Sequence, residues 1–385
     1  MHVTCCQSKL RKGLAIAFHA ISSRSTLPVL SNVLLTAKDD TLTLASTNLE
    51  LGLVCTVEAS IIEEGALTIP AKLFSEFIAS LPEDGVTLKT TKETMTITSG
   101  RQHATIHGMS ADEFPSIPLD QHGTPVILPA AIFKAMSEDV VIAASKDDAR
   151  PVFTGVLAEI TENTLTLAAA DSFRLAVHSC ALPADGHPCG SYLIPATTLS
   201  ELGKLLTTTD GDVALYVTEK KTQLLFQTMH ASLVTRLIDG QFPNYRQLFP
   251  KEIVTTATLD RAAFLSATKA AALFARESSN ILRLSIAMDN AEETGISGDT
   301  KPVDGLLTLE ASAEDVGQST STVPLTFDGP PITIIFNVSY LMEVLSILHE
   351  EQVQLQFTTN QATALLRPVG NEDYTYLIMP MHNVR

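Results

Sequence analysis

Two hydrophobic patterns alternate along the chain. Apolar residues at helical spacing predict amphipathic helices over about Lys9–Ala20, Ala130–Ala144 and Arg261–Ala275. Segments of strict alternation, such as Thr41–Ala45 and Met95–Thr98, predict strands that bury one face. The chain is therefore expected to combine a few helices with many strands.

The pattern repeats three times. Leu42-Thr43-Leu44 recurs as Leu165-Thr166-Leu167 and as Leu307-Thr308-Leu309, at offsets of 123 and 142 residues. A longer segment, which predicts a strand entering a helix, starts at Ile69 and returns at Ile194 and Phe336, at offsets of 125 and 142. Because two separate markers give nearly the same periods, the chain is interpreted as three copies of one domain.

Each copy is expected to form an α+β domain, with two helices packed on antiparallel sheets of about eight strands. Glu113–Ile117 and Gln241–Tyr245 lead into Pro-containing linkers. These linkers predict domains at residues 1–122, 123–251 and 252–385. Polar residues around 291–304 predict an extended hairpin loop, which explains the longer third period.

Composition narrows the class of protein. The 385 residues carry a net charge of −17, with 43 acids and 26 bases, so overall charge does not attract DNA or anionic lipid. Five cysteines without a CxxC pair favour a reducing compartment over a disulfide framework. No secretory signal and no apolar run long enough for a membrane span is found. A cytoplasmic protein is expected.

The bases are not spread evenly. About ten of the 26 lie on or beside predicted helices, whereas many acids fall in loops and at strand ends. A solvated helix face is the simplest explanation. Three equivalent helix pairs that carry bases in an acidic protein instead favour a local positive surface, which contacts a phosphate backbone without reading bases. These helix-associated bases are Lys9, Arg11, Lys12, Arg24, Lys72, Lys134, Lys146, Lys204, Arg261, Lys269 and Arg276.

Motifs of catalysis are missing from the sequence. No phosphate-binding glycine loop and no Gly-x-Ser-x-Gly elbow is present. His103 and His107 lie in an alternating segment without the glutamate of a metalloprotease helix. Cys180, His187 and Cys189 have no fourth ligand at a matching spacing, so incidental thiols are favoured over a zinc site. No metal, no cofactor and no enzyme activity is expected.

Five ordered motifs resemble the bacterial DNA polymerase sliding clamp family, the beta subunit of the replicative polymerase. The resemblance covers essentially the whole chain. It rests on Arg24–Leu30 (RSTLPVL), Ala169–Ala176 (AADSFRLA), Asp239–Tyr245 (DGQFPNY), Phe336–Leu341 (FNVSYL) and Met379–Met381 (MPM).

The resemblance implies a non-catalytic processivity factor. Two protomers form a head-to-tail dimeric ring of six domains, which encircles double-stranded DNA with its helices lining the hole. By likeness of position, the expected DNA-facing residues are Arg24, Lys72, Lys146 and Lys204. Glu343 stands on a third-domain helix without Lys or Arg and departs from an evenly basic lining.

The resemblance also implies a hydrophobic pocket between the second and third domains. The replicative polymerase, the clamp loader and repair proteins insert short hydrophobic peptides there. Transferred residue by residue, the pocket comprises Phe153, Arg174, Leu175, Pro243, Leu248, Asn337, Tyr340, Thr363, Leu377, Ile378, Met379, Pro380 and Met381. Apolar walls with flexible methionines suit varied peptides, while a few polar groups fix the peptide backbone.

Several positions depart from the family pattern. Ala170, Ser172 and Phe173 stand where Thr, Gly and His are usual, and Gln247 and Gln361 replace Arg and Val. Phe173 is expected to narrow or reshape the pocket, which predicts an altered preference among partner peptides.

The ring interface is expected to place Ile106 of one protomer against Leu273 and Phe274 of the other. Ala104 replaces a larger apolar residue there, so the strength of the dimer is left open. Two alternatives stay open: a ring-forming scaffold that recruits peptides without loading onto DNA, and a hydrolase that uses His178 or His187.

Overall fold

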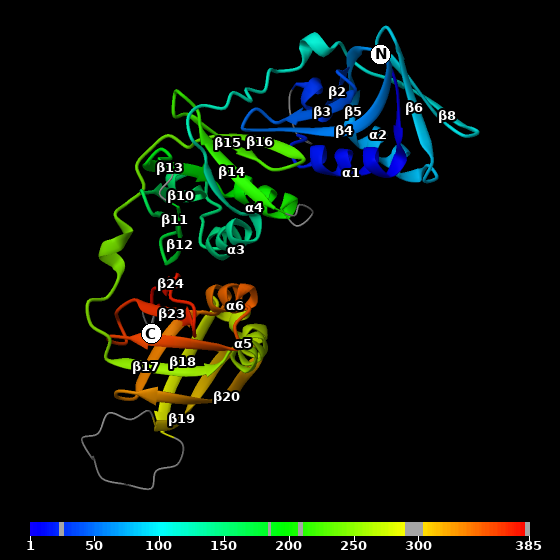
Figure 1. The fold of residues 1–385 in the computed structure, drawn as a ribbon. Helices are drawn as coiled ribbons and strands as arrows, with labels where there is room; N and C mark the ends of the chain where they lie inside the picture. Colours follow the sequence, from blue (N-terminus) through cyan, green and yellow to red (C-terminus); the bar gives the residue numbers. More distant parts are fainter. Residues whose placement is uncertain (23–26, 184–185, 207–210, 289–302, 382–385) are drawn as a thin grey trace. The chain divides into compact units, whose positions relative to one another are not determined.

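The computed structural model describes residues 1–22, 27–183, 186–206, 211–288 and 303–381 (Figure 1). Within these residues each repeat has two α-helices and eight strands, as the sequence predicts. Arg24, a predicted DNA-facing residue, and most of the predicted 291–304 loop lie outside the described residues.

The helices occur at matching places in the three repeats. The predicted helix over Arg261–Ala275 is confirmed to the residue. The helix predicted from Lys9 starts two residues earlier than expected, and the helix predicted from Ala130 ends three residues earlier than expected. Asp260 Oδ1 accepts from Ala263 N at 2.6 Å, and this N-cap fixes the start of the fifth helix. The helices are α1 (Gln7–Phe18), α2 (Ala71–Ser80), α3 (Ala130–Val141), α4 (Ala196–Leu205), α5 (Arg261–Ala275) and α6 (Val338–Ile347).

The strands also follow the repeat. The first copy has β1 (His2–Cys6), β2 (Asn32–Lys38), β3 (Thr41–Thr47), β4 (Leu51–Glu63), β5 (Gly65–Pro70), β6 (Gly85–Thr91), β7 (Thr94–Ser99) and β8 (Gln102–His107). The middle copy has β9 (Val126–Pro129), β10 (Gly155–Ile160), β11 (Thr164–Ala170), β12 (Arg174–Ala181), β13 (Gly190–Pro195), β14 (Asp212–Val217), β15 (Gln223–Gln227) and β16 (Ala231–Arg236). The third copy has β17 (Thr255–Asp260), β18 (Ile281–Met288), β19 (Val303–Ala313), β20 (Gly317–Asp328), β21 (Ile332–Asn337), β22 (Gln352–Phe357), β23 (Ala364–Pro368) and β24 (Tyr374–Ile378).

The chain divides into two compact units that do not coincide with the three repeats. One unit comprises residues 1–134, 182–189 and 197–237, and the other comprises residues 135–181, 190–196 and 238–385. The middle repeat is shared, because one of its sheets belongs to each unit. The domain limits predicted from the sequence remain predictions.

The first unit is built on a sheet that runs through two repeats. Strand β4 pairs with β16 in antiparallel register, with Leu51 opposite Thr235 and Cys55 opposite Ala231. We call this strand pair the first seam. Helix α1 packs on β3 and β4, and the apolar side chains of Leu10, Leu14 and Ala17 are buried there.

The second unit repeats this arrangement. Strand β12 pairs with β24, with Arg174 opposite Ile378 and His178 opposite Tyr374. We call this strand pair the second seam. Both Tyr374 and Tyr376 are fully buried, so aromatic packing closes this seam.

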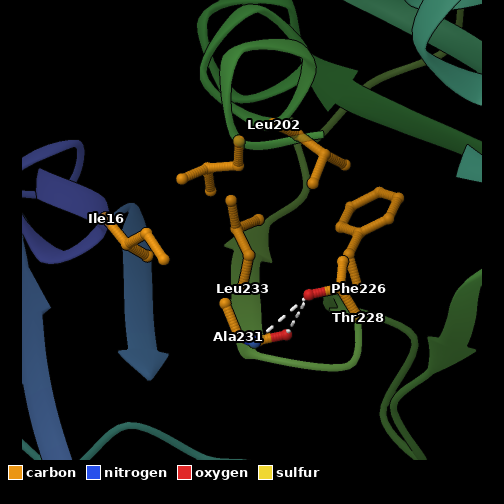
Figure 2. Close-up of a pocket in the computed structure, with 7 residues that line it drawn as sticks. Ile16, Leu202, Phe226, Thr228, Ala231 and Leu233 are labelled. Carbon is orange, nitrogen blue, oxygen red and sulfur yellow. Dashed lines mark hydrogen bonds between the residues drawn. The ribbon is translucent and has the colours of Figure 1, made fainter. Parts of the chain in front are cut away.

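The first seam is closed by apolar packing between two helices and a hairpin. Ile16 of α1 and Leu202 of α4 point toward Phe226 and Leu233 of the β15–β16 hairpin (Figure 2). The space that remains between these side chains, about 10 Å³, holds no more than about one water molecule. This hollow is therefore a packing feature and not a ligand site.

In the described residues, no helix is both long and apolar enough to cross a membrane.

Candidate functional site

The helix-associated bases lie both on helices and in the loops beside them. Lys72 is exposed on α2, and Lys204 is exposed in the last turn of α4. Lys146 lies in the exposed loop after α3, beside the helix, which ends at Val141. Helix α6 carries no base, as the sequence indicated.

Several of the bases have structural partners that the sequence did not indicate. The Arg261 guanidinium donates to the carbonyl oxygens of Leu345 (3.2 Å) and Glu350 (2.9 Å), so it stabilises the end of α6. Lys9 pairs with Glu58 of β4 on the protein surface. In the third repeat Arg261 is therefore engaged within the fold, and the positive surface formed by three base-bearing helix pairs stays a prediction.

The residues expected to form the peptide pocket gather at the second seam. Leu175 lies opposite Leu377 in the paired strands, and both side chains are buried in one apolar cluster. Phe153 packs against that cluster, and its ring lies edge-on to Phe242, with the centroids 6.3 Å apart. Ile378 lies on the same strand, fully buried.

The turn before β12 is held by its own side chains. Asp171 Oδ1 accepts from the backbone N–H groups of Phe173 (2.7 Å) and Arg174 (3.0 Å). The backbone of Met379 donates to the Phe173 carbonyl oxygen at 2.9 Å, which ties this turn to the end of β24. The side chains of Phe173 and Met379 are left exposed, at 56% and 45%.

Arg174 is the buried cation of the site, with only 8% of its surface exposed. It bonds to Asp171 at 3.0 Å and to Glu343 at 2.5 Å, and its guanidinium lies 4.3 Å from the centre of the Tyr340 ring. Burial acts to lower the pKa of Arg174, but its neighbours, Tyr376 and Glu343 among them, raise that pKa above its usual value. The arginine is therefore charged and fully engaged within the protein.

Tyr340 and Phe173 form an aromatic face. The two rings are stacked, with centroids 6.5 Å apart and planes inclined by 23°. Burial, and next the Asp171 carboxylate, raise the pKa of the Tyr340 hydroxyl, so it remains neutral and available as a donor.

The remaining pocket residues take different roles. Asn337 caps α6 by accepting from Ser339 N at 2.9 Å, so its side chain is used within the fold. Pro243 and Leu248 are exposed on either side of the buried Tyr245, whose hydroxyl donates to Glu159 at 2.7 Å. Thr363 immediately precedes β23.

A polar hollow adjoins the end of the chain that the structure describes. Pro380 and Met381 line it together with Gln361 and Arg283, and Met381 N donates to the Ile335 carbonyl oxygen at 2.8 Å. Gln361 was marked from the sequence as a departure, and here it lies beside the predicted pocket residues. This hollow extends the second-seam site past Met379.

Sequence reasoning missed one functional candidate. Glu343 was interpreted as an exception among channel-facing residues, yet its carboxylate binds Arg174. Helical spacing contained the signal, because Glu343 follows Tyr340 by three residues on α6 and so lies on the same face.

The predicted ring-interface residues differ in exposure. Leu273 projects from α5 with 65% of its surface exposed, but Ile106 is only 5% exposed and packs inside its own domain. The side chain of Ile106 thus offers little surface to a partner, although the strand that carries it lies at the sheet edge.

Some histidines were candidates for a catalytic or metal site. They either bond to other residues of the fold or lack a set of metal ligands around them. His103 and His107 bond to Thr98 and Thr94, each at 3.2 Å across β7 and β8. His178 bonds to Asp139 at 2.7 Å beside Tyr374. Within the described part of the chain, no three His, Cys, Asp or Glu side chains group as metal ligands, and His187 is buried.

Comparison with known proteins agrees with the repeat and the site. Residues 1–118, 127–244 and 246–382 match the N-terminal, central and C-terminal domains of the DNA polymerase III beta subunit. The beta sliding clamp of Synechococcus elongatus is 33% identical over 388 residues, covering 99% of each chain. That of Pseudomonas putida is 29% identical, covering 99% of this chain and 100% of the relative.

Solved structures are similar over the same length. The DNA polymerase III subunit beta of Pseudomonas aeruginosa superimposes with a TM-score of 0.88 at 27% identity, covering 99% of this chain and 100% of that one. A sliding clamp from the same organism, bound to griselimycin, gives 0.89 at 27% identity and covers 99% of both chains. The matched relatives are clamps and polymerase subunits, which supports the expectation of a chain without a catalytic site. By these matches, which span all three repeats, the chain belongs to the DNA polymerase III beta subunit family, the beta sliding clamps.

Proposed function

We propose that two copies of this chain close head to tail into a ring around double-stranded DNA and tether a replicative polymerase through the second-seam site. The observation that carries the ring is the rule by which the repeats join. At both seams the fourth strand of one repeat, β4 or β12, pairs with the eighth strand of the next, β16 or β24.

This rule leaves two strands without such a partner: β20, the fourth strand of the third repeat, and β8, the eighth strand of the first repeat. Among the described strands, β8 pairs only with β7. The Gly317–Pro324 half of β20 pairs only with β19, because β17 covers β20 from Leu325 onward. Unpaired strand edges are templates for pairing with another chain. Joining β20 of one protomer to β8 of the other completes the series.

The internal repeat also predicts the register of that junction. Leu51 and Arg174 begin their strands and lie opposite Thr235 and Ile378, respectively. The corresponding first residue of β20 is Gly317, and the corresponding residue of β8 is Ile106. Because antiparallel pairing proceeds residue by residue, Ser319 should lie opposite Ala104 and Ser321 opposite Gln102.

The side chains near these edges support an apolar contact. Leu273 and Val316 are exposed, and Phe274 lies close to the start of β20, 3.8 Å from where a Cβ at Gly317 would stand. Leu73 of α2 is likewise exposed, in the same domain as β8. Covering such side chains removes apolar area from water and stabilises the closed ring.

The charge distribution supports loose contact with duplex DNA. A net charge of −17 disfavours binding on the outside of the protein, whereas Lys72 and Lys204 project from helices. We propose that these bases, with Lys146 and Arg24, contact phosphates without reading sequence. Retention then comes from encirclement, so that each contact can be weak enough to permit sliding.

The second seam supplies the tethering site. Exposed Phe173, Met379 and Leu248 lie on or beside a buried apolar cluster, and the Tyr340 hydroxyl is available nearby as a hydrogen-bond donor. We propose that short hydrophobic segments of the replicative polymerase, the clamp loader and repair proteins bind there. A cytoplasmic, nucleoid-associated location follows from these partners.

Disulfide trapping tests the ring through the predicted pairing register of β20 and β8. In a Cys6→Ser/Cys189→Ser background, Ala104→Cys with Ser319→Cys should link two protomers under mild oxidation, because directly opposite Cβ atoms lie close together. The matched control, His103→Cys with Ser319→Cys, places the two thiols on opposite faces of the sheet and should remain unlinked. Equal yields from both variants, or linkage only in the control, would contradict the predicted junction.

DNA retention separates the clamp from the peptide-recruiting scaffold. After loading by the cognate clamp loader, the protein should stay on nicked circular duplex and leave once the circle is linearised. Lys72→Glu with Lys146→Glu should reduce retention severalfold, whereas Lys251→Glu, in an exposed loop, should not. A scaffold would show neither topological retention nor the charge effect.

A further inference from the structure

The pocket turn and α6 place a carboxylate beside an exposed aromatic face. Phe173 is 56% exposed and stacks on Tyr340, while the Glu343 side chain is 41% exposed. Arg174 joins the two features, because it lies over the Tyr340 ring and bonds to Glu343. A segment that covers Phe173 must therefore pass close to Glu343.

Charge at this end of the site is unbalanced. Asp171 and Glu343 both bind Arg174, so two carboxylates face one buried cation. Only one oxygen of Glu343, Oε2, bonds to Arg174 Nη1. The partly exposed carboxylate can therefore accept a second charged donor at the surface.

Two arginines that lie near this end of the site have other partners or surroundings. Arg150 donates to Oγ of Ser172 at 2.9 Å, and Ser172 is the residue before Phe173. Arg283 lines the polar hollow with Pro380 and Met381. Neither arginine bonds to Glu343 in the described structure. The excess negative charge therefore remains on the Glu343 carboxylate, beside Tyr340.

We infer that Phe173 and Glu343 together select partner segments in which an apolar or aromatic side chain stands next to a lysine or arginine. This inference rests on the proposed function, because it specifies what the second-seam site prefers. The apolar side chain packs on the Phe173–Tyr340 face, and the neighbouring cation pairs with the outer oxygen of Glu343. Acidic residues at that position are disfavoured by the same carboxylate.

Matched synthetic peptides test the preference by fluorescence anisotropy. Each peptide carries a Leu-Phe pair, with Lys, Gln or Glu placed in turn at each of the three positions before and after it. At one or more positions the Lys peptide should bind about five-fold tighter than the Glu peptide at low salt, as expected for a partly exposed charge pair. High salt should reduce that ratio.

Two variants separate the parts of the inference. Glu343→Gln should bring the Lys-to-Glu affinity ratio at that position close to one and leave the Gln peptide within about two-fold. Arg174 keeps Asp171 in this variant, so the turn persists. Phe173→Ala should weaken every peptide several-fold without changing the ratio. Glu372→Gln, an exposed acid elsewhere in the unit, is the charge-matched control.

The outcomes distinguish this inference from the proposed function. If the peptides bind tightly but Glu343→Gln lowers the Lys-to-Glu affinity ratio at no position, the peptide site stands and the preference is overturned. A general preference for Glu peptides overturns it as well. Absence of binding by every peptide overturns the site itself, and the preference with it.

Discussion

The two seams pair their strands in the same way, but the side chains that they expose differ in chemical character. At the first seam Arg236 N donates to the Glu50 carbonyl oxygen at 2.9 Å, and at the second seam Met379 N donates to the Phe173 carbonyl oxygen at the same distance. These residues occupy equivalent places relative to the paired strands. The first seam therefore exposes a Glu and an Arg where the second exposes a Phe and a Met.

The difference shows how one repeated junction acquired two uses. The strand pairing supplies cohesion at both seams, and it depends on the backbone rather than on the exposed side chains. Side chains at the turn and at the strand end then decide whether the junction is a solvated surface or an apolar docking face. In the proposed ring, the unpaired edges of β8 and β20 form a third junction of the same plan.

The largest expected effect concerns cohesion of the second seam. Tyr376→Ala removes a fully buried ring from the paired strands and should lower the free energy of unfolding by about 3–5 kcal/mol. Tyr376→Phe keeps the ring but loses a 3.4 Å contact to the Tyr340 carbonyl oxygen and the hydrogen bond between its hydroxyl and Arg174, so it should cost about 1–2 kcal/mol. Urea denaturation measures both, and equal losses would contradict packing as the source of cohesion.

The next effect concerns the docking face. Phe173→Glu with Met379→Arg gives the second seam the side chains of the first, and peptide affinity should fall more than tenfold. Both side chains are exposed, so the free energy of unfolding should change by about 0.5 kcal/mol or less. Anisotropy titration with the Leu-Phe peptides measures the loss. Unchanged affinity would show that peptides bind elsewhere on the protein.

The smallest effect concerns acid stability at the first seam. Burial acts to raise the pKa of Glu201, but the bonds from Lys204 (2.7 Å) and His19 (2.5 Å) outweigh it, and the pKa is lowered. A lowered folded-state pKa stabilises the protein above the ordinary value of 4.5. That stabilisation is lost as the pH falls through the lower folded-state value.

Replacement of this carboxylate should therefore change the pH dependence. Glu201→Gln should cost under about 1 kcal/mol at pH 7, and its stability should converge with that of the parent protein as the pH falls below 4.5. Urea denaturation across pH measures the convergence. Glu219→Gln, an exposed acid in the same unit, is the control and should run parallel to the parent.

Much of the fold could be predicted from the sequence because it is repeated. Leu42-Thr43-Leu44 and its two counterparts marked the period, and helical spacing located α5 to the residue. Local patterns of this kind act within a few residues of each other. The seams could not be predicted in the same way, because Leu51 and Thr235 meet across 184 positions of the chain.

The candidate site shows the same limit. Residues transferred from the family pattern, such as Arg174 and Leu377, do meet at the second seam. Lys146 lies beside α3 as expected, whereas Glu343 was assigned to the channel because its contact with Arg174 is long-range. Burial of Ile106 likewise depends on tertiary packing that its strand pattern does not specify.

The mass of the protein in solution tests the central claim most directly. Light scattering across a dilution series should give twice the 41.3 kDa of one chain, about 83 kDa, because the proposed ring pairs β20 of each protomer with β8 of the other. Leu273→Glu should lower that mass toward one chain without unfolding the protomer, since Leu273 is exposed. A monomer at micromolar concentration, or a trimer, would contradict closure of two three-repeat chains into one ring.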